Sequence, residues 1–176
     1  SQGLVLTNHH CAYGAIQGFS SPENDYLTDG FFALSKDQEM NIEGFEVSFL
    51  VRIDDITDRI LANVTNEMSE DERTQAIQTT QNEINTEYAE GDVHGYQYEV
   101  KSFYYGNEFY MFIYNTYRDI RLVGAPPESV GKYGGDTDNW MWPRHTGDFS
   151  MLRIYADADN KPADYSESNV PYTPKR

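Results

Sequence analysis

Apolar and polar residues alternate along residues 45–54, and this period of two limits the fold more than any other feature of the sequence. Successive side chains of an extended chain point to opposite faces, so the alternation predicts a strand with one well-buried face. The apolar members are Phe45, Val47, Phe49, Val51 and Ile53. A sheet with a packed face is therefore expected in any fold that this chain adopts.

Further strand patterns lie on both sides of that run. They are rich in branched and aromatic residues and cover residues 4–9, 96–100, 109–117, 118–123 and 149–155. Gly106-Asn107 predicts a hairpin turn, and the small and apolar residues 12–16 predict one helical turn after the first strand. The expected fold class is mainly β.

One segment predicts a long helix. Ser69 followed by Glu72 is a capping box, in which the serine oxygen accepts from the backbone of the third helical residue and the glutamate reaches back. A helix from about Glu70 to Tyr88 follows, with a narrow apolar stripe. The stripe consists of Ala76, Ile77, Ile84 and Tyr88. This pattern favours a solvated helix on a β core over a coiled-coil or partner helix.

The charge balance excludes one class of partner. The 176 residues include 13 Lys and Arg against 29 Asp and Glu, a formal net charge of −16. Nucleic acid is not an expected partner, because neutralising phosphates needs a basic surface. No run approaches the roughly 18 apolar residues that a membrane span requires, so none is expected.

Two features suggest a chain that starts mid-fold. The sequence opens at Ser1-Gln2-Gly3 without Met and enters a strand pattern at once. Cys11 is the only cysteine. It is either a small buried thiol or one half of a bridge whose partner lies elsewhere.

His9, His10 and Cys11 follow the first strand directly. A histidine at a strand end followed by cysteine is typical of the general base of chymotrypsin-like peptidases. Zinc is a poor alternative, since consecutive residues of a strand face opposite ways and cannot share one tetrahedral ion. A cysteine nucleophile at Cys11 is disfavoured on the same extended backbone, and no metal or other cofactor is expected.

A second informative segment covers residues 134–150. Both tryptophans of the chain, Trp140 and Trp142, fall within three residues of it. Exposing an indole costs about 1.5 to 3 kcal/mol, so these side chains are expected to be anchored or to bind something. Asp136 and Asp138 do not form a calcium loop of the EF-hand type, because the glutamate at the twelfth position is missing.

Residues 3–11 and 134–150 resemble the two signature stretches of the bacterial dipeptidyl-peptidase family of chymotrypsin-like serine exopeptidases, the dipeptidyl peptidase 7 and 11 type. Residues 25–31 and 161–166 support the resemblance, which runs through nearly the whole chain. The tryptophan-bearing segment is its most specific part.

The resemblance implies a role for several residues. His10 corresponds to the general base, and His9 to a structural neighbour. Asp148 corresponds to the acid that orients the imidazole. Asn139 and Trp140 correspond to residues that bind the free α-amino group of a peptide, which restricts cleavage to the bond after the second residue. The family also implies a periplasmic or cell-surface enzyme that acts on peptides with a free N-terminus and, at full length, forms a homodimer.

No serine of this chain lies in the glycine-rich setting that an oxyanion hole needs. His10 and Asp148 are 138 positions apart, against roughly 45 in the chymotrypsin template, so insertions are expected between them. Residues 1–176 are therefore expected to be a partial peptidase domain: the first barrel of a chymotrypsin-like double β-barrel, incomplete at both ends, with a helical insertion at about 55–90. Such a piece lacks the nucleophile and should be inactive alone.

A non-catalytic, acidic β module that binds a ligand is the alternative function. In that case His10 and Asp148 would be ordinary structural residues. The two hypotheses differ in geometry, because a catalytic pair requires the imidazole Nδ1 within about 2.6 to 3.2 Å of an Asp148 oxygen.

Overall fold

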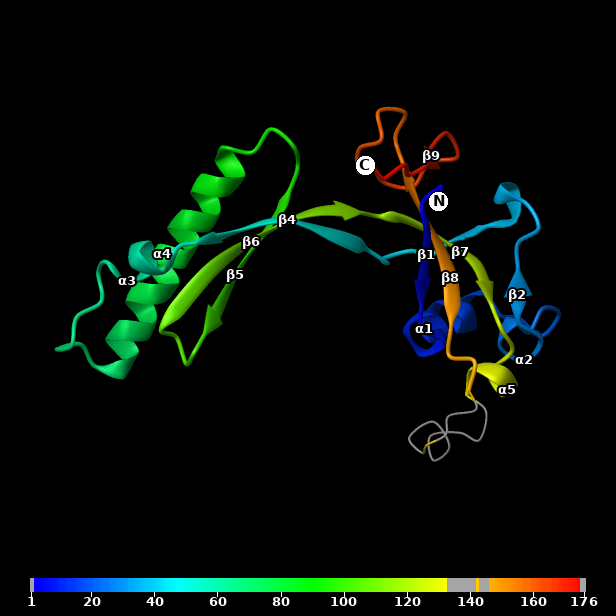
Figure 1. Cartoon of the computed structure of the whole chain (residues 1–176), viewed down its shortest axis with the longest axis horizontal. Helices are drawn as coiled ribbons and strands as arrows, with labels where there is room; N and C mark the ends of the chain where they lie inside the picture. The colour runs from blue at the N-terminus through cyan, green and yellow to red at the C-terminus, as the bar shows by residue number, and fades with distance from the viewer. Residues whose placement is uncertain (1, 133–141, 143–145, 175–176) are drawn as a thin grey trace. The chain divides into compact units, whose positions relative to one another are not determined.

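The computed structural model describes residues 2–132, 142 and 146–174. It divides into two compact units, each treated separately below (Figure 1). Unit 1 comprises Ser1–Val47 and Tyr117–Arg176, and unit 2 comprises Ser48–Thr116. The predicted helical insertion at about 55–90 falls within unit 2.

Unit 1 is built on an antiparallel sheet with the strand order β1-β8-β7-β2. Its main strands are β1 (Leu4–Thr7), β2 (Phe31–Phe32), β7 (Asp119–Ala125) and β8 (Ser150–Ala156). Two short strands extend it: β3 (Met40–Asn41) pairs with β7, and β9 (Val170–Pro171) pairs with β8. The helical elements are α1 (His9–Phe19), α2 (Tyr26–Asp29), η1 (Lys36–Gln38) and α5 (Glu128–Gly131).

The core of unit 1 lies between this sheet and helix α1. Ala12 and Ile16 of α1 are fully buried and belong to one cluster with residues of β7 and β8. Every residue of β7 is buried, including two charged ones. Burial of this much apolar surface fixes the sheet and the helix against each other.

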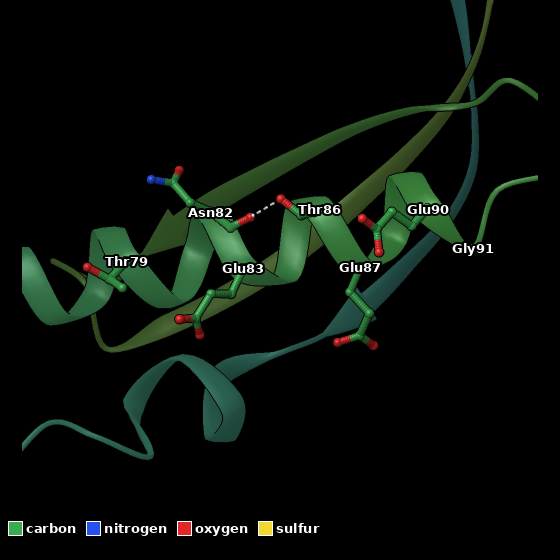
Figure 2. Close-up of a pocket in the computed structure, with 7 residues that line it drawn as sticks. All are labelled: Thr79, Asn82, Glu83, Thr86, Glu87, Glu90 and Gly91. Carbon is green, nitrogen blue, oxygen red and sulfur yellow. Dashed lines mark hydrogen bonds between the residues drawn. The ribbon is translucent and has the colours of Figure 1, made fainter.

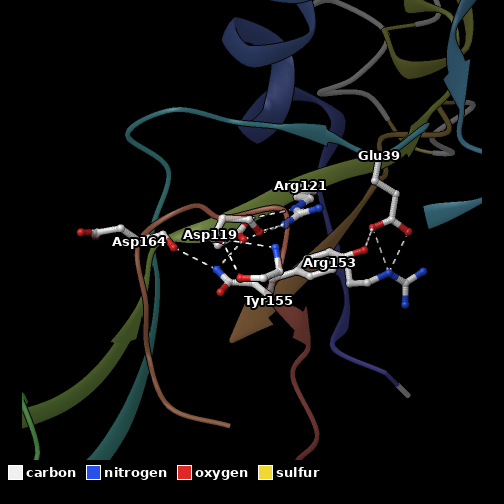
Figure 3. Close-up of polar contacts among 9 residues, drawn as sticks. Glu39, Asp119, Arg121, Arg153, Tyr155 and Asp164 are labelled. Carbon is white, nitrogen blue, oxygen red and sulfur yellow. Dashed lines mark hydrogen bonds and ion pairs between the residues drawn. The ribbon is translucent and has the colours of Figure 1, made fainter. Parts of the chain in front are cut away.

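The charged side chains of β7 are satisfied by a polar network (Figure 3). Arg121 donates to both oxygens of Asp119, at 2.9 and 2.8 Å, and to the Ser166 carbonyl at 2.9 Å. Asn169 donates to Asp119 Oδ2 at 2.9 Å. The guanidinium also lies 3.7 Å from the ring centre of Tyr155, so the buried charges are paired and hydrogen-bonded.

A second contact of the network ties β8 to Glu39. Arg153 donates to the two Glu39 oxygens at 2.8 and 3.1 Å, and the Tyr155 hydroxyl donates to the same carboxylate at 2.9 Å. Burial, with the Glu39 carboxylate beside it, raises the pKa of Tyr155 to about 12. The Tyr155 hydroxyl therefore keeps its proton across the physiological pH range.

Unit 2 is a three-stranded sheet packed with helices (Figure 1). Its strand order is β4-β6-β5, with β4 at Val47–Asp55, β5 at Gln97–Phe103 and β6 at Glu108–Tyr117. The helices are α3 (Thr57–Leu61) and α4 (Glu70–Glu90). The turn at Gly106 joins β5 and β6 into an antiparallel hairpin, as the sequence predicts.

The long helix α4 confirms the capping-box prediction. The Ser69 hydroxyl accepts from the backbone N–H of Glu72, and the Glu72 carboxylate accepts from the backbone N–H of Ser69. Ile84 of α4 is buried in one cluster with Phe109 and Met111 of β6. The helix is thus a largely solvated one that packs on a sheet, as predicted. No described helix combines the length and the apolar character needed to cross a membrane.

Two expectations about the fold are wrong. The described residues are mixed α and β rather than mainly β, because residues 9–19 form the eleven-residue helix α1 instead of a single turn. Strand β4 lacks a well-buried face, since Phe49 and Val51 are 39% and 46% exposed. The core of unit 2 is drawn from α3, α4, β5 and β6 instead. Both described sheets are also open, with two free ends in each strand order.

Candidate active site

Strand pairing brings two distant segments of unit 1 together. Strands β1 and β8 are antiparallel, and their register ends with Thr7 opposite Ser150. Helix α1 begins just after the first of these residues, and Asp148 lies just before the second. Because antiparallel neighbours keep their register, the start of α1 and Asp148 meet at the same edge of the sheet.

Asp148 receives three kinds of hydrogen bond from the start of α1. Its Oδ1 accepts from the backbone N–H of His10 at 3.1 Å. Its Oδ2 lies 2.7 Å from His10 Nδ1 and accepts from Asn8 Nδ2 at 3.0 Å. The His10–Asp148 distance falls inside the range that separates the two functional hypotheses.

The same carboxylate caps the helix. Asn8 is the residue before α1, but its side chain makes no cap hydrogen bond and instead donates from Nδ2 to Asp148. Asp148 caps the helix instead, because its Oδ1 accepts from the backbone N–H of His10 in the first turn. The helix dipole also favours a negative charge at this end. Partial burial raises the pKa of Asp148, but the hydrogen bonds from His10 and Asn8 outweigh it and hold that pKa below its usual value.

His10 is oriented at one nitrogen and open at the other side. An ionised carboxylate only accepts, so Nδ1 carries the proton of this hydrogen bond. In the neutral ring, Nε2 then has a free lone pair. The His10 side chain is 58% exposed, against 17% for Asp148. The arrangement can accept a proton at Nε2 and stabilise the resulting imidazolium through Asp148.

The neighbouring histidine, His9, differs from His10 in its burial and its contacts. His9 is fully buried, and its ring packs edge-on to Tyr13 with 6.0 Å between ring centres. Burial lowers the pKa of His9, although Asp148 and Glu128 act in the opposite direction. His9 and His10 lie in helix α1, so the strand geometry expected for them is wrong. The strand itself ends at Thr7.

The remaining predicted site residues have other positions. Asn139 and Trp140 lie outside the described residues, as do Asp136 and Asp138. Trp142 is 89% exposed. Cys11 is a free and exposed thiol, so the alternative of a small buried thiol is wrong, whereas a bridge to a cysteine outside this chain stays a prediction. Within the described part of the chain, no three His, Cys, Asp or Glu side chains come together as a metal site.

A hollow on the surface of unit 2 is of a different kind. It lies along α4 and is lined by Thr79, Asn82, Glu83, Thr86, Glu87, Glu90 and Gly91. Figure 2 shows that its polar groups are side chains of one solvated helix, with the Thr86 hydroxyl donating to the Asn82 carbonyl at 2.9 Å. Arg59 neutralises Glu87 at 2.6 Å. The lining residues include no histidine, cysteine or serine.

Sequence reasoning missed the contribution of Asn8. Its position one residue before a helix is typical of a cap, and here it fixes Asp148 instead. A signal for this was present, because Asn directly precedes the histidine pair. Helix α5 was not predicted either; its Val130 carbonyl accepts from the N–H of Gly147 at 2.9 Å, next to Asp148.

An imidazole held at one nitrogen by a carboxylate and open at the other is typical of hydrolases that activate a hydroxyl nucleophile. The fold and this pair point to that class of protein. Comparison with protein families identifies the family within this class, because the family described as Peptidase S46 matches residues 1–176. The chain belongs to the peptidase S46 family.

Its relatives include two proteins of Capnocytophaga gingivalis. A dipeptidyl-peptidase 7 is 51% identical over 174 residues, which cover 99% of this chain and 24% of the relative. An Asp/Glu-specific dipeptidyl-peptidase is 50% identical over 175 residues, with the same coverage. The chain thus spans about a quarter of the length of these relatives.

A solved structure agrees with the fold. The crystal structure of Porphyromonas endodontalis DPP11 in complex with substrate superposes with a TM-score of 0.86 at 46% identity. The match covers 99% of this chain and 26% of that protein. The fold of this chain therefore corresponds to part of a dipeptidyl peptidase of the same family.

Proposed function

We propose that this chain is part of a serine dipeptidyl peptidase and supplies the general base His10 and the orienting acid Asp148. The 2.7 Å contact between His10 Nδ1 and Asp148 Oδ2 is the observation that carries the proposal. The family relationship supports it, because relatives about 50% identical are dipeptidyl peptidases. The serine nucleophile would come from another part of the full-length enzyme.

The proposed reaction is acyl transfer in two halves. His10 Nε2 takes the proton of the serine hydroxyl as its oxygen bonds to the peptide carbonyl carbon. The imidazolium then gives this proton to the leaving amine as the C–N bond breaks. In the second half, His10 takes a proton from water as the water oxygen bonds to the acyl carbon. The proton then passes to the serine oxygen as the ester bond breaks, and the dipeptide is released as a carboxylic acid. Asp148 holds the Nδ1–H tautomer and stabilises the imidazolium without taking its proton.

Asn139 and Trp140 are proposed to bind the free α-amino group of the substrate. An amide oxygen accepts hydrogen bonds from an ammonium, and an indole face attracts a cation. An ammonium held at a fixed distance from the nucleophile allows attack only on the second peptide bond. Peptides with a free N-terminus are therefore the proposed substrates.

The finer fold assignment belongs to the same proposal. We propose that the sheet of unit 1 is part of a chymotrypsin-like barrel that closes with other segments of the full-length enzyme. The antiparallel pairing and the meeting of His10 and Asp148 beside β1 and β8 support this. By the family resemblance, the enzyme is proposed to be a homodimer in the periplasm or at the cell surface.

Covalent labelling tests the proposal. A fluorophosphonate reagent should modify one serine of the full-length protein, and His10→Ala should abolish the modification. The 176-residue chain alone should remain unlabelled and inactive. Labelling of the isolated chain, or labelling of the full-length protein that does not depend on His10, would contradict the proposal.

A further inference from the structure

The buried histidine beside the proposed base is a feature that the mechanism does not use. His9 has an exposed fraction of 0%. Neither ring nitrogen makes a hydrogen bond of ordinary geometry with a described residue, although the Pro126 carbonyl lies close enough to act on the pKa of the ring. Burying an unpaired polar ring costs free energy, so such a residue in a folded protein calls for a reason. The contacts of the His9 ring supply such a reason.

The His9 ring fills the space that a side chain at position 131 would occupy, where the chain has Gly131. A Cβ at Gly131 would lie 2.6 Å from Cγ of His9 and 2.9 Å from its Cδ2 and Nδ1. Only glycine leaves room for the ring, so the imidazole of α1 packs directly on the backbone of α5. Among the described residues, the charged groups that act on the ring are Asp148, Glu128 and Lys132, and the Pro126 carbonyl acts on it as well.

Helix α5 in turn holds the segment that carries Asp148. The Val130 carbonyl accepts from the backbone N–H of Gly147 at 2.9 Å. A Cβ on Gly147 would lie 2.9 Å from Cγ1 of Val130, so this approach is also close. Gly147 directly precedes Asp148, and Asp148 binds His10.

These contacts form a closed circuit. It runs from His9 to Gly131, through α5 from Val130 to Gly147, and from Asp148 back to His10. A shift of α5 relative to α1 therefore has to change either the Val130–Gly147 bond or the position of Asp148. Catalytic groups lose efficiency steeply with misplacement, about 100-fold for 1 Å, so the circuit bears directly on rate.

We propose that His9 is a positioning residue, whose packing on Gly131 sets the place of Asp148 relative to His10. This inference rests on the proposed function of the His10–Asp148 pair. Because burial lowers the pKa of His9, the ring is neutral at neutral pH and packs on Gly131 without bringing a buried charge to the site.

Three variants of the full-length enzyme test this role. His9→Ala removes the ring, Gly131→Ala places a methyl group where the ring lies, and the double variant combines a vacancy with the group that fills it. Each single variant should lower kcat by about 10- to 100-fold and leave KM within about twofold. The double variant should recover most of kcat, because the two changes act on one contact.

Gly14→Ala is the matched control. It makes the same substitution on α1, where an added Cβ meets no atom within 4 Å, and should leave kcat unchanged. The proton NMR signal of the carboxylate-bound Nδ1–H of His10, followed in the 176-residue chain, provides a second readout. It should shift or broaden in both single variants and return in the double variant.

Two results would overturn the inference. One is a kcat within twofold of the wild type in both single variants. The other is a folded double variant whose kcat stays as low as that of the single variants. If a single variant fails to fold, the kcat of the double variant alone tests the inference.

His10→Ala is measured in parallel. If it keeps full activity, the proposed function itself fails, whereas an inactive His10→Ala beside active His9 and Gly131 variants contradicts only the role of His9.

Discussion

Two of the acid–base pairs in unit 1 are built alike and exposed differently. Arg121 binds both oxygens of Asp119, and their side chains are 10% and 0% exposed. Asp148 also uses both oxygens, one on the His10 ring and one on its backbone N–H, but the His10 side chain is 58% exposed. One pair is closed to solvent, and the other presents its titratable ring to it.

The difference indicates what each pair can do. The Asp119 carboxylate also accepts a hydrogen bond from Asn169, and the Arg121 guanidinium lies against the Tyr155 ring. Both charged groups of this pair therefore have their partners within the protein. The hydrogen bond of Asp119 raises the pKa of Arg121 above an already high value, so no proton leaves it. In its neutral form, the His10 ring has a nitrogen lone pair that the contact with Asp148 does not use. The closed pair therefore stabilises the sheet, and the open pair is suited to proton transfer.

The largest expected effect is on activity through the open pair. In the full-length enzyme, His10→Ala should lower kcat/KM by about 10⁴-fold or more, since the proton acceptor is lost. The melting temperature should change little, because the ring is mostly exposed. Steady-state kinetics on dipeptidyl substrates measure this. His94→Ala, at another exposed histidine, is the matched control, and an equal loss there would break the comparison.

Asp148→Asn should have a similar but smaller effect on kcat, about 10³- to 10⁴-fold. The amide still accepts hydrogen bonds, but it favours the wrong imidazole tautomer and cannot stabilise the imidazolium. The same kinetics check this, with Asp159→Asn as an exposed control. Activity within tenfold of the wild type would show that Asp148 does not orient His10.

Asp119→Asn should act on stability instead. It leaves Arg121 buried with an incomplete partner, and we expect the free energy of unfolding to fall by about 3–5 kcal/mol. Urea unfolding of the 176-residue chain measures this loss, and kcat per folded full-length molecule should stay near the wild-type value.

Glu46→Gln is the control for that effect, because the Glu46–Arg118 pair is 43% and 47% exposed. An exposed pair contributes only about 0–1 kcal/mol. Equal destabilisation by the two variants would mean that burial does not distinguish the pairs.

The smallest expected effect is the pH dependence of stability through Asp148. Its pKa in the folded chain lies below the ordinary value of 3.8, so the unfolded state binds more protons as the pH falls. The stability that Asp148 contributes is present above that value and is lost as pH falls through the folded pKa. Between pH 6 and pH 3, Asp148→Asn should lose less stability than the wild type. Urea midpoints at the two pH values test this, and equal losses would contradict it.

The sequence predicted local features of the fold better than their packing. Ser69 and Glu72 specified the start of α4, because capping depends on residues three positions apart. Strand β4 was predicted to be buried on one face, but alternation only defines two faces and does not say which one is covered. Residues 9–19 form a helix because Ala12 and Ile16 pack on the sheet, a tertiary effect that local patterns do not contain.

The candidate site was predictable in part. His10 and Asp148 were paired across 138 positions by family resemblance, and no local pattern links them. Asn8 and the Gly131 contact escaped prediction, because they depend on the register of β1 with β8 and on the position of α5. Two neighbouring histidines also look equivalent in sequence, whereas the helix buries His9 and exposes His10.

Product analysis tests the central claim most directly. The full-length enzyme and its His10→Ala variant are incubated with an unblocked oligopeptide and with its N-acetylated form, and the products are identified by mass spectrometry. The account predicts dipeptides from the unblocked peptide only, and only when His10 is present. Dipeptide release by His10→Ala at the wild-type rate, or equal cleavage of the acetylated peptide, would contradict it.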